Sequence, residues 1–179
     1  DGSEVELHSD TLLIADQQGP LAIAGVMGGE RSKVSATTRR ILFESAHFRP
    51  ATIMGKARRH GLSTDSSHRF ERGVDPAAPA RAMMRAVALC AEIAGGAPGA
   101  LLAVESVAAL PQPATIRLRK ARLAAVLGFT VDDAEVAAHL RALGLTVQDG
   151  GEHWQVETPT ARFDLSIEAD LIEEVARLV

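Results

Sequence analysis

The chain has 179 residues, 46% of them hydrophobic and 23% charged, a balance that is typical of a globular protein with an apolar core. Its net charge of -4 excludes a protein that binds nucleic acid through a basic surface spread over the whole chain. No apolar run reaches the ~18 residues of a membrane-spanning helix, and the single Cys90 excludes a disulfide within the chain.

Two short apolar runs predict strands near the start of the chain, over residues 11–15 and 21–26. Turn residues separate the two runs, and the glycines of the second run and of Gly28-Gly29 interrupt its pattern. Residues 40–43 (RILF) are a third strand candidate. This part of the chain therefore predicts a small sheet.

Helices are expected after these strands. Pro50 suits a first helical turn, and residues 51–60 are expected to form one helix. The polar stretch over residues 61–76 (GLSTDSSHRFERGVDP) is expected to be a solvated loop. A further helix is predicted over residues 80–94, because its apolar residues form a broad face and Gly95-Gly96 ends it.

A change in composition marks a domain boundary after this helix. Residues 95–113 carry proline and glycine at both ends of an apolar centre, which we interpret as a strand followed by a linker. We therefore divide the chain into a first domain over residues 1–98, a linker over 99–112 and a second domain over 113–179.

The second domain has clear element boundaries. Gly128 and Gly144 end two helices, Asp132 caps the second of them, and Asp149-Gly150-Gly151 marks a hairpin turn. The predicted elements are a strand over 116–119, helices over 120–127 and 132–143, hairpin strands over 145–148 and 154–157, and a last helix over 168–178.

The predicted fold class is therefore α+β. A mixed α/β portion comes first, and a small winged-helix-like domain with an acidic C-terminal helix follows it. The opening residues DGSEVELHSD and the uncapped helix at the end also lead us to expect a segment of a longer protein.

Three features of the first domain together predict a binding pocket. Gly28-Gly29 follows a strand, where missing side chains let a ligand approach the backbone. Glu44 interrupts an apolar run, and a carboxylate there needs a hydrogen-bond donor or a charged partner. Thr64 and Ser66 add hydroxyl groups. The combination favours a site that recognises a small polar group.

Simpler interpretations of the same residues remain open. Ser66 and His68 are too loosely patterned to indicate a hydrolase triad. The basic cluster Lys56, Arg58, Arg59, His60, Arg69 and Arg72 is typical of a solvated helix face, but it could also hold a phosphate or an RNA end.

Three stretches of the chain resemble the beta subunit of bacterial phenylalanyl-tRNA synthetase, and the resemblance runs through essentially the whole chain in the right order. They are LLIADQQGPLAIAGVMGGE, ILFESAHFRPATIMGKARRHGLSTDSSHRFERGVDP and TARFDLSIEADLIEEVARLV. The resemblance implies that residues 1–98 are the later part of a tRNA-editing domain. It also implies a cytoplasmic ligase that proofreads tyrosine wrongly attached to phenylalanine tRNA.

The resemblance implies roles for four residues of the editing pocket. Gly28 lines the pocket, Glu44 accepts a hydrogen bond from the tyrosine para-hydroxyl, and Thr64 lies beside the substrate. Ser66 stands at a pocket-lining place where relatives commonly have alanine. No catalytic residue is assigned, because the editing site of the family also uses residues, including a histidine, from sequence before this stretch.

The acidic C-terminal segment is a candidate half of a magnesium site. Asp170, Glu173 and Glu174 project from one helical face, and Asp164 precedes them. A solvated first helical turn explains the same pattern. The resemblance implies that these four positions hold Mg²⁺ shared with the alpha subunit, in an assembly of two alpha and two beta subunits. We expect weak magnesium binding or none in this chain by itself.

The same resemblance places phenylalanine activation in the alpha subunit. ATP is thus a substrate of the whole enzyme and is not expected to bind this chain. The expected partners are the alpha subunit and phenylalanine tRNA, with no membrane and no DNA. Two alternatives stay open: a nucleic-acid-binding module without chemistry, and a structural assembly module with a vestigial pocket.

Overall fold

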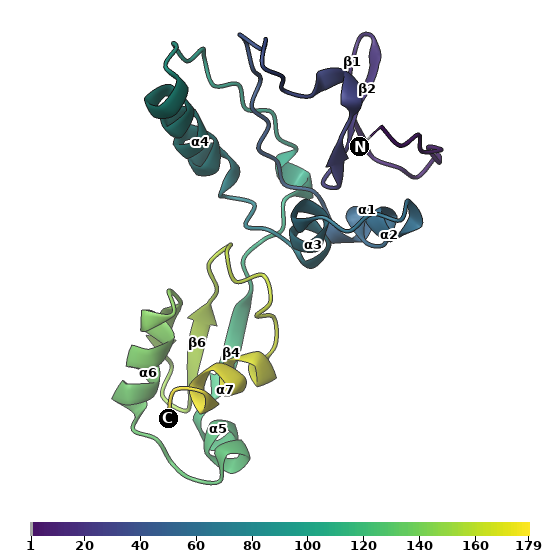
Figure 1. The fold of residues 1–179 in the computed structure, drawn as a ribbon. Helices are drawn as coiled ribbons and strands as arrows, with labels where there is room; N and C mark the ends of the chain where they lie inside the picture. The colour runs from purple at the N-terminus through teal and green to yellow at the C-terminus, as the bar shows by residue number, and fades with distance from the viewer. Residues whose placement is uncertain (1) are drawn as a thin grey trace. The chain divides into compact units, whose positions relative to one another are not determined.

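The computed structural model describes residues 2–179 and separates the chain into two compact units. The first unit holds the residues up to 74 together with 78–103, and the second holds 75–77 and 104–179. Figure 1 shows the elements of each unit. None of the helices within residues 2–179 has the length and apolar character that crossing a bilayer requires.

The sheet of the first unit is antiparallel, in the order β1-β2-β3. Its strands are β1 (Leu13–Asp16), β2 (Gly19–Ile23) and β3 (Met27–Gly28). A two-residue turn joins β1 to β2, because Asp16 pairs with Gly19. The two strands predicted from the apolar runs are confirmed. The short β3 brings Gly28 opposite Ala22.

The third strand predicted in this unit is wrong. Residues 38–49 form no strand ladder, although they carry the apolar run RILF. Ile41 and Leu42 are 47% and 93% exposed, so neither apolar side chain is driven into a sheet by burial. The segment instead runs from the short 3-10 helix η1 (Glu30–Ser32) to the first α-helix, past the β1-β2-β3 sheet.

The helices of the first unit differ from the prediction at two places. They are α1 (Pro50–Ile53), α2 (Lys56–Arg59), α3 (Asp65–Arg72) and α4 (Pro79–Ala94). The single helix expected over residues 51–60 is broken at Gly55, which has a φ of 76° that favours glycine. The solvated loop expected over residues 61–76 is also wrong, because its centre forms α3.

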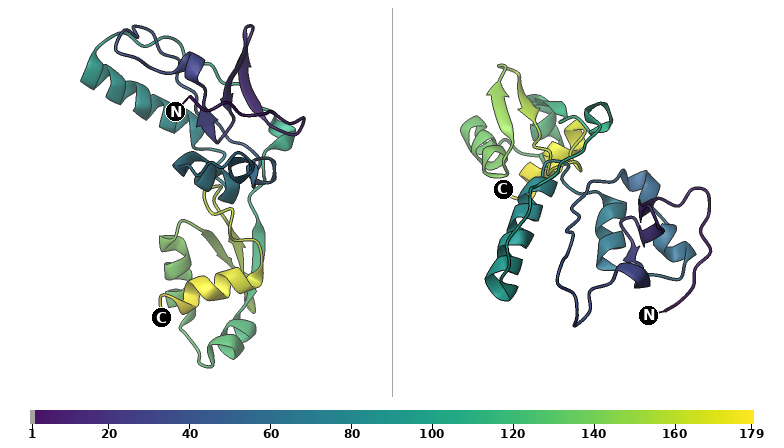
Figure 2. Two further views of the ribbon diagram at one scale, coloured as in Figure 1. Left: turned by 45° about the vertical axis from the view of Figure 1, so that its right-hand side comes forward. Right: turned by 90° about the horizontal axis from the view of Figure 1, so that it is seen from above.

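The core of the first unit is small. It contains Val26, Ile53 and Ala57, against which Phe48 and Phe70 pack with their ring centroids 5.0 Å apart. The predicted apolar face of α4 takes no part in it, because α4 has no buried residue. Figure 2 shows α4 standing clear of the β1-β2-β3 sheet. The strand expected after α4 is wrong, since residues 95–113 contain only the 3-10 helix η2 (Val107–Ala109).

The second unit follows the prediction closely. Its antiparallel sheet has the order β4-β6-β5, and α5, α6 and α7 pack against it. The α+β class and the winged-helix-like outline of two helices followed by a hairpin are therefore confirmed. The elements are β4 (Thr115–Arg119), α5 (Lys120–Leu127), α6 (Asp133–Ala142), β5 (Thr146–Asp149), β6 (His153–Glu157) and α7 (Glu168–Ala176).

A continuous core explains this agreement. The three α-helices and three strands of the second unit each contribute at least one buried apolar residue to one cluster, in which Trp154 is 2% exposed. Asp132 accepts hydrogen bonds from the backbone N–H groups of Ala134 and Glu135, at 2.9 and 3.4 Å, and so caps α6 as predicted.

Candidate functional site

An open pocket of about 440 Å³ lies in the first unit between the β1-β2-β3 sheet, the extended segment before α1 and the start of α3. Gly28, Glu44, Thr64 and Ser66 all line it. Three segments that are far apart in the sequence thus bring the four predicted pocket residues together. The remaining lining residues are Ile14, Ala22, Ile23, Ala24, Val26, Met27 and Asp65.

Glu44 supplies a carboxylate that no protein group neutralises. Its side chain is exposed, and within residues 2–179 it has no hydrogen-bond or ion-pair partner. The sequence led us to expect a partner for this charge. The carboxylate is exposed in the open pocket, so it does not require a partner within the chain. Glu44 is therefore available as a hydrogen-bond acceptor for a ligand that enters the pocket.

Thr64 holds the pocket together through its hydroxyl group. The Oγ1–H donates to the backbone carbonyl of Val26 at 2.8 Å, and the same oxygen accepts from the N–H of Ser67 at 3.0 Å. The buried Ser67 Oγ in turn accepts from the N–H of Thr64, which completes a capping box for α3. Thr64 thus fixes the start of α3 to the turn before β3, and its proton is not free for a ligand.

Gly28 and Gly29 are adjacent but have different structural requirements. A Cβ atom on Gly28 would meet nothing within 4 Å, so a side chain there would point into open space. A Cβ on Gly29 would lie 2.7 Å from the carbonyl oxygen of Leu21, which also accepts the N–H of Gly29 at 2.7 Å. Gly29 is needed for backbone packing, whereas the missing side chain of Gly28 leaves space for a ligand in the pocket.

Ser66 is half-buried at the pocket floor, and its hydroxyl has no partner within the described part of the chain. Asp65 precedes it in the first turn of α3 and is exposed. The pocket thus combines an apolar wall from the sheet with two carboxylates and one free hydroxyl. An apolar wall with a few polar groups is the usual lining of a site that recognises a small ligand.

A smaller hollow of about 240 Å³ lies in the second unit, beside Lys120 and Trp154. The Lys120 ammonium lies 4.9 Å from the centroid of the Trp154 ring and pairs with Asp133 and Asp149 at 2.5 and 3.1 Å. These partners raise the pKa of Lys120, with the hydrogen bond to Asp133 as the largest cause. Lys120 and Asp133, the two charged residues that line the hollow, are thus already engaged with each other.

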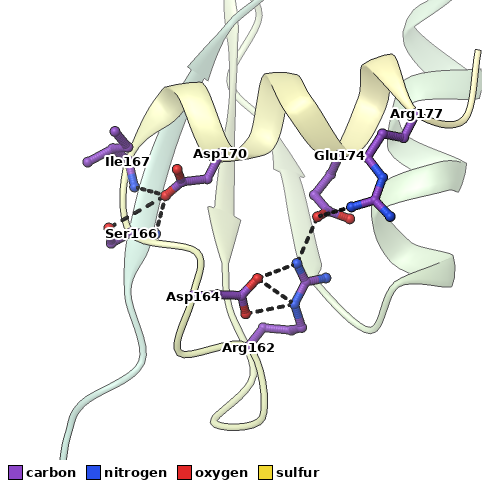
Figure 3. Close-up of polar contacts among 7 residues, drawn as sticks. All are labelled: Arg162, Asp164, Ser166, Ile167, Asp170, Glu174 and Arg177. Carbon is purple, nitrogen blue, oxygen red and sulfur yellow. Dashed lines mark hydrogen bonds and ion pairs between the residues drawn. The ribbon is translucent and has the colours of Figure 1, made fainter. Parts of the chain in front are cut away.

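Two acidic residues of the C-terminal segment, Asp164 and Glu174, share one partner, Arg162 (Figure 3). The Arg162 guanidinium donates to Asp164 through Nε at 2.9 Å and through Nη2 at 2.7 Å. The same Nη2 donates to Glu174 at 2.8 Å, while Arg177 reaches Glu174 only at 3.9 Å. Arg162 holds the pKa of Asp164 below its ordinary value. The structure thus brings Asp164 and Glu174 together around a cation that the chain itself supplies.

Asp170 faces away from that pair and caps α7. Its Oδ2 accepts the backbone N–H groups of Ser166 and Ile167, at 2.8 and 2.9 Å (Figure 3). These bonds lower the pKa of the Asp170 carboxyl. Glu173 is exposed and has no side-chain partner in the part of the chain that the structure describes.

The donor chemistry of these four residues suits Mg²⁺, which takes oxygen ligands. Their arrangement does not: within residues 2–179, no three or more histidine, cysteine or acidic side chains converge into a group that could hold a metal ion. The four carboxylates therefore form no metal site in this arrangement.

Comparison with known proteins identifies both units. Residues 1–95 match the B3/4 domain, and residues 116–179 match the tRNA synthetase B5 domain. The chain belongs to the B3/4 domain family.

The similar proteins are much longer than this chain. The phenylalanine–tRNA ligase beta subunits of Nitrosococcus oceani, Xanthomonas euvesicatoria and Shewanella oneidensis are 53%, 52% and 55% identical to this chain over 99% of its length. The chain spans 22% of the length of each. The family resemblance found in the sequence is therefore confirmed.

Some residues that shape the B3/4 pocket were not predicted from the sequence. Met27 and Asp65 line it, and Ser67 orders the start of α3. The pattern Thr64-x-x-Ser67 is the signal that could have predicted the helix start. It is a weak signal because Ser at this position is less typical of a capping box than Glu or Gln.

The basic cluster of the B3/4 domain is partly neutralised. Lys56 and Arg59 both pair with Asp10, and this lowers the pKa of Asp10 to about 2. Arg72 Nη1 lies 2.9 Å from the His68 ring nitrogen and donates to the His68 carbonyl at 3.0 Å. These contacts favour a structural role for much of the cluster over a phosphate-binding one.

Proposed function

We propose that this chain is the B3/4 and B5 portion of a phenylalanine–tRNA ligase beta subunit, and that its B3/4 pocket selects tyrosine wrongly attached to phenylalanine tRNA for hydrolysis. One observation carries the proposal. Gly28, Glu44, Thr64 and Ser66, which the family resemblance assigns to the editing pocket, line one open pocket. A collapsed core at these positions would have favoured a vestigial pocket instead.

The dimensions and lining of the pocket suit an amino-acid side chain. Its volume of about 440 Å³ falls within the range of roughly 300–1,000 Å³ for small-molecule sites. Ile14, Ile23 and Val26 offer an apolar surface to an aromatic ring. Glu44 provides an acceptor for a polar group carried by that ring.

Proofreading of this kind has a clear physical reason. Phenylalanine and tyrosine differ by one hydroxyl group, and an apolar pocket rejects an added hydroxyl by only about a hundredfold. A second site that requires the hydroxyl sorts the two amino acids in the opposite direction. The Glu44 carboxylate supplies this requirement, because a hydrogen bond to a charged acceptor stabilises a complex by about 1.5–3 kcal/mol.

The pocket contributes specificity, and the chemistry of hydrolysis comes from elsewhere. Its lining residues include no histidine or lysine, and we assign the carboxylate of Glu44 to recognition of the substrate hydroxyl. Thr64 acts by fixing α3 against the turn before β3, since its hydroxyl proton is bound to Val26. We assign no catalytic residue in this chain.

The proposal extends to the partners of the whole subunit. An alpha subunit would activate phenylalanine with ATP, and phenylalanine tRNA would deliver the mischarged amino acid to the pocket in a cytoplasmic assembly of two alpha and two beta subunits. The B5 domain would take part in assembly. A nucleic-acid-binding role for α6 receives no support, because its first turn carries Asp133 and Glu135.

The test is a pair of substitutions in the full-length beta subunit assembled with its alpha subunit. Glu44→Ala should leave aminoacylation with phenylalanine near the parental rate and slow the release of tyrosine from tyrosyl-tRNA at least about tenfold, the equivalent of ~1.4 kcal/mol. Asp65→Asn is the matched control, since Asp65 lines the same pocket and is also exposed. Parental deacylation by Glu44→Ala would contradict the role of Glu44.

A further inference from the structure

Arg162 occupies the centre of the acidic segment in the B5 domain. Its guanidinium binds Asp164 at 2.7 Å and Glu174 at 2.8 Å, and so it bridges two of the four positions that the family resemblance assigns to magnesium (Figure 3). The Arg162 side chain is 24% exposed and that of Glu174 is 13% exposed, so solvent screens this contact only in part.

The other two acidic residues cannot complete a site around this centre. Asp170 is bound to the backbone N–H groups of Ser166 and Ile167, where it caps α7. Glu173 is exposed on the same helix without a partner within residues 2–179. A divalent ion would therefore find one free carboxylate, two that are bound to a cation, and one that is bound to backbone.

The geometry of the Arg162 guanidinium suits its contacts with the two carboxylates. Its planar donors bind a carboxylate in a two-point contact, here through Nε and Nη2 to Asp164. Nη2 also reaches Glu174, twelve residues further along the chain, and so fastens the loop before α7 to that helix. Mg²⁺ gives up its bound waters reluctantly and does not readily displace a contact of this kind.

We propose that Arg162 is the resident cation of this site: it neutralises Asp164 and Glu174 and excludes divalent ions until its side chain moves away. Arg162 then keeps the loop and α7 in place while no ion is present. Its departure requires a new partner for the guanidinium, either water or a carboxylate from another chain.

The direct test is the substitution Arg162→Met in this chain, with Mg²⁺ as the probe. Isothermal titration calorimetry should show binding of Mg²⁺ at least about tenfold tighter in Arg162→Met than in the parental chain, because two carboxylates lose their cation. Thermal unfolding followed by the fluorescence of Trp154 should show that MgCl₂ raises the Tm of the variant and leaves that of the parental chain unchanged.

Arg177→Met is the matched control. Arg177 also lies near Glu174, but at 3.9 Å and with 69% of its side chain exposed, so its loss should leave Mg²⁺ binding as in the parental chain. Equal Mg²⁺ affinity in the parental chain and in Arg162→Met would overturn the proposal. Absence of Mg²⁺ binding in a folded Arg162→Met variant would overturn it as well.

A measurement on the parental chain covers the case in which Arg162→Met does not fold. The Nε–H signal of Arg162 can be followed by nuclear magnetic resonance during a titration with MgCl₂. The proposal expects the signal to stay in place at millimolar Mg²⁺, because the Nε–H remains bound to Asp164. A signal that moves and begins to exchange with water would show that Mg²⁺ displaces the guanidinium, and it would overturn the proposal.

Discussion

At the scale of single residues, two neighbouring glycines have different roles: Gly28 leaves open space beside the pocket, and Gly29 allows close packing of the backbone. A Trp side chain at Gly28 has open space to enter, whereas any side chain at Gly29 meets the Leu21 carbonyl. We predict that Gly28→Trp changes the free energy of unfolding by less than about 0.5 kcal/mol and blocks the clearance of tyrosine. Denaturation followed by circular dichroism, together with deacylation of tyrosyl-tRNA, measures both.

Gly29→Ala is the matched control for that substitution. It should destabilise the B3/4 domain by about 1–3 kcal/mol, because a Cβ atom would force the β2-β3 connection apart. If Gly28→Trp unfolds the protein as Gly29→Ala does, the first glycine is required for backbone geometry and the role given to it in the pocket is wrong.

A second prediction at this scale concerns Glu168 and pH. The Arg119 side chain, which donates to Glu168 at 2.6 Å, and the Arg119 backbone N–H lower the pKa of Glu168 from 4.5 to about 2. The lowered pKa means that the folded state favours the ionised form of Glu168. This contact therefore stabilises the fold fully above the unfolded-state pKa of 4.5, and the stabilisation is lost as the pH falls towards 2.

The substitution Glu168→Gln should therefore lower the Tm at neutral pH and have little effect near pH 2. The loss should be about 1 kcal/mol or less, because Arg119 is half exposed and solvent screens the pair. Trp154 is the only tryptophan of the chain and is buried in the B5 core, so its fluorescence measures this unfolding. A Tm difference that is constant from neutral to acidic pH would contradict the assignment.

At the scale of elements, the capping box of α3 decides the shape of the pocket. Thr64→Val removes the Oγ1 that accepts from Ser67 and donates to Val26, while it keeps the volume of the side chain. The loss of an N-cap costs about 0.5–2 kcal/mol, and we expect the upper half of that range. Chemical denaturation followed by far-ultraviolet circular dichroism measures it.

Thr64→Ser keeps the hydroxyl group and should retain most of the parental stability. If Thr64→Val were as stable as the parental chain, the capping box would contribute nothing to stability, and other contacts of α3, such as the packing of Phe70 and the hydrogen bond from the Gly55 N–H to Glu71, would hold the helix. Both variants should keep the B5 unfolding transition seen by Trp154 unchanged.

The elements also mark the limits of prediction from sequence. Helices and hairpin strands of the B5 domain were predictable to within a few residues, because Gly128, Asp132 and Gly144 mark their ends and a continuous core supports them. The conformation of residues 38–49 was not predictable. The apolar run RILF has a strand-like composition, but its residues form a strand only if they pair with a sheet and are buried there. Gly55 broke a helix that its neighbours favour.

The candidate site was also predictable only in part. Gly28 and Glu44 were identifiable because each contradicts its local pattern, a glycine after a strand and a carboxylate in an apolar run. The partner of Asp164 and Glu174 was not identifiable from the sequence, because nothing in the sequence distinguishes Arg162 from an ordinary surface arginine. Only the fold shows that its guanidinium reaches Asp164 and Glu174 together.

At the scale of the whole molecule, the two units have cores of very different extent. The B5 core joins the three α-helices and three strands of its unit, whereas the buried cluster of the B3/4 unit contains Val26, Ile53 and Ala57. We predict that the B3/4 unit unfolds at a lower temperature. Trp154 fluorescence should then give a higher Tm than far-ultraviolet circular dichroism, which follows both units. Coincident Tm values would contradict this prediction.

The B3/4 pocket gives the molecule its proposed role, and the selectivity of hydrolysis tests that role most directly. The measurement is the ratio of the deacylation rates of tyrosyl-tRNA and phenylalanyl-tRNA by the full-length enzyme, for the parental protein and for Glu44→Ala. We predict that the parental enzyme favours tyrosyl-tRNA and that Glu44→Ala moves the ratio towards one, because the acceptor for the para-hydroxyl is gone. An unchanged ratio in Glu44→Ala would contradict the account.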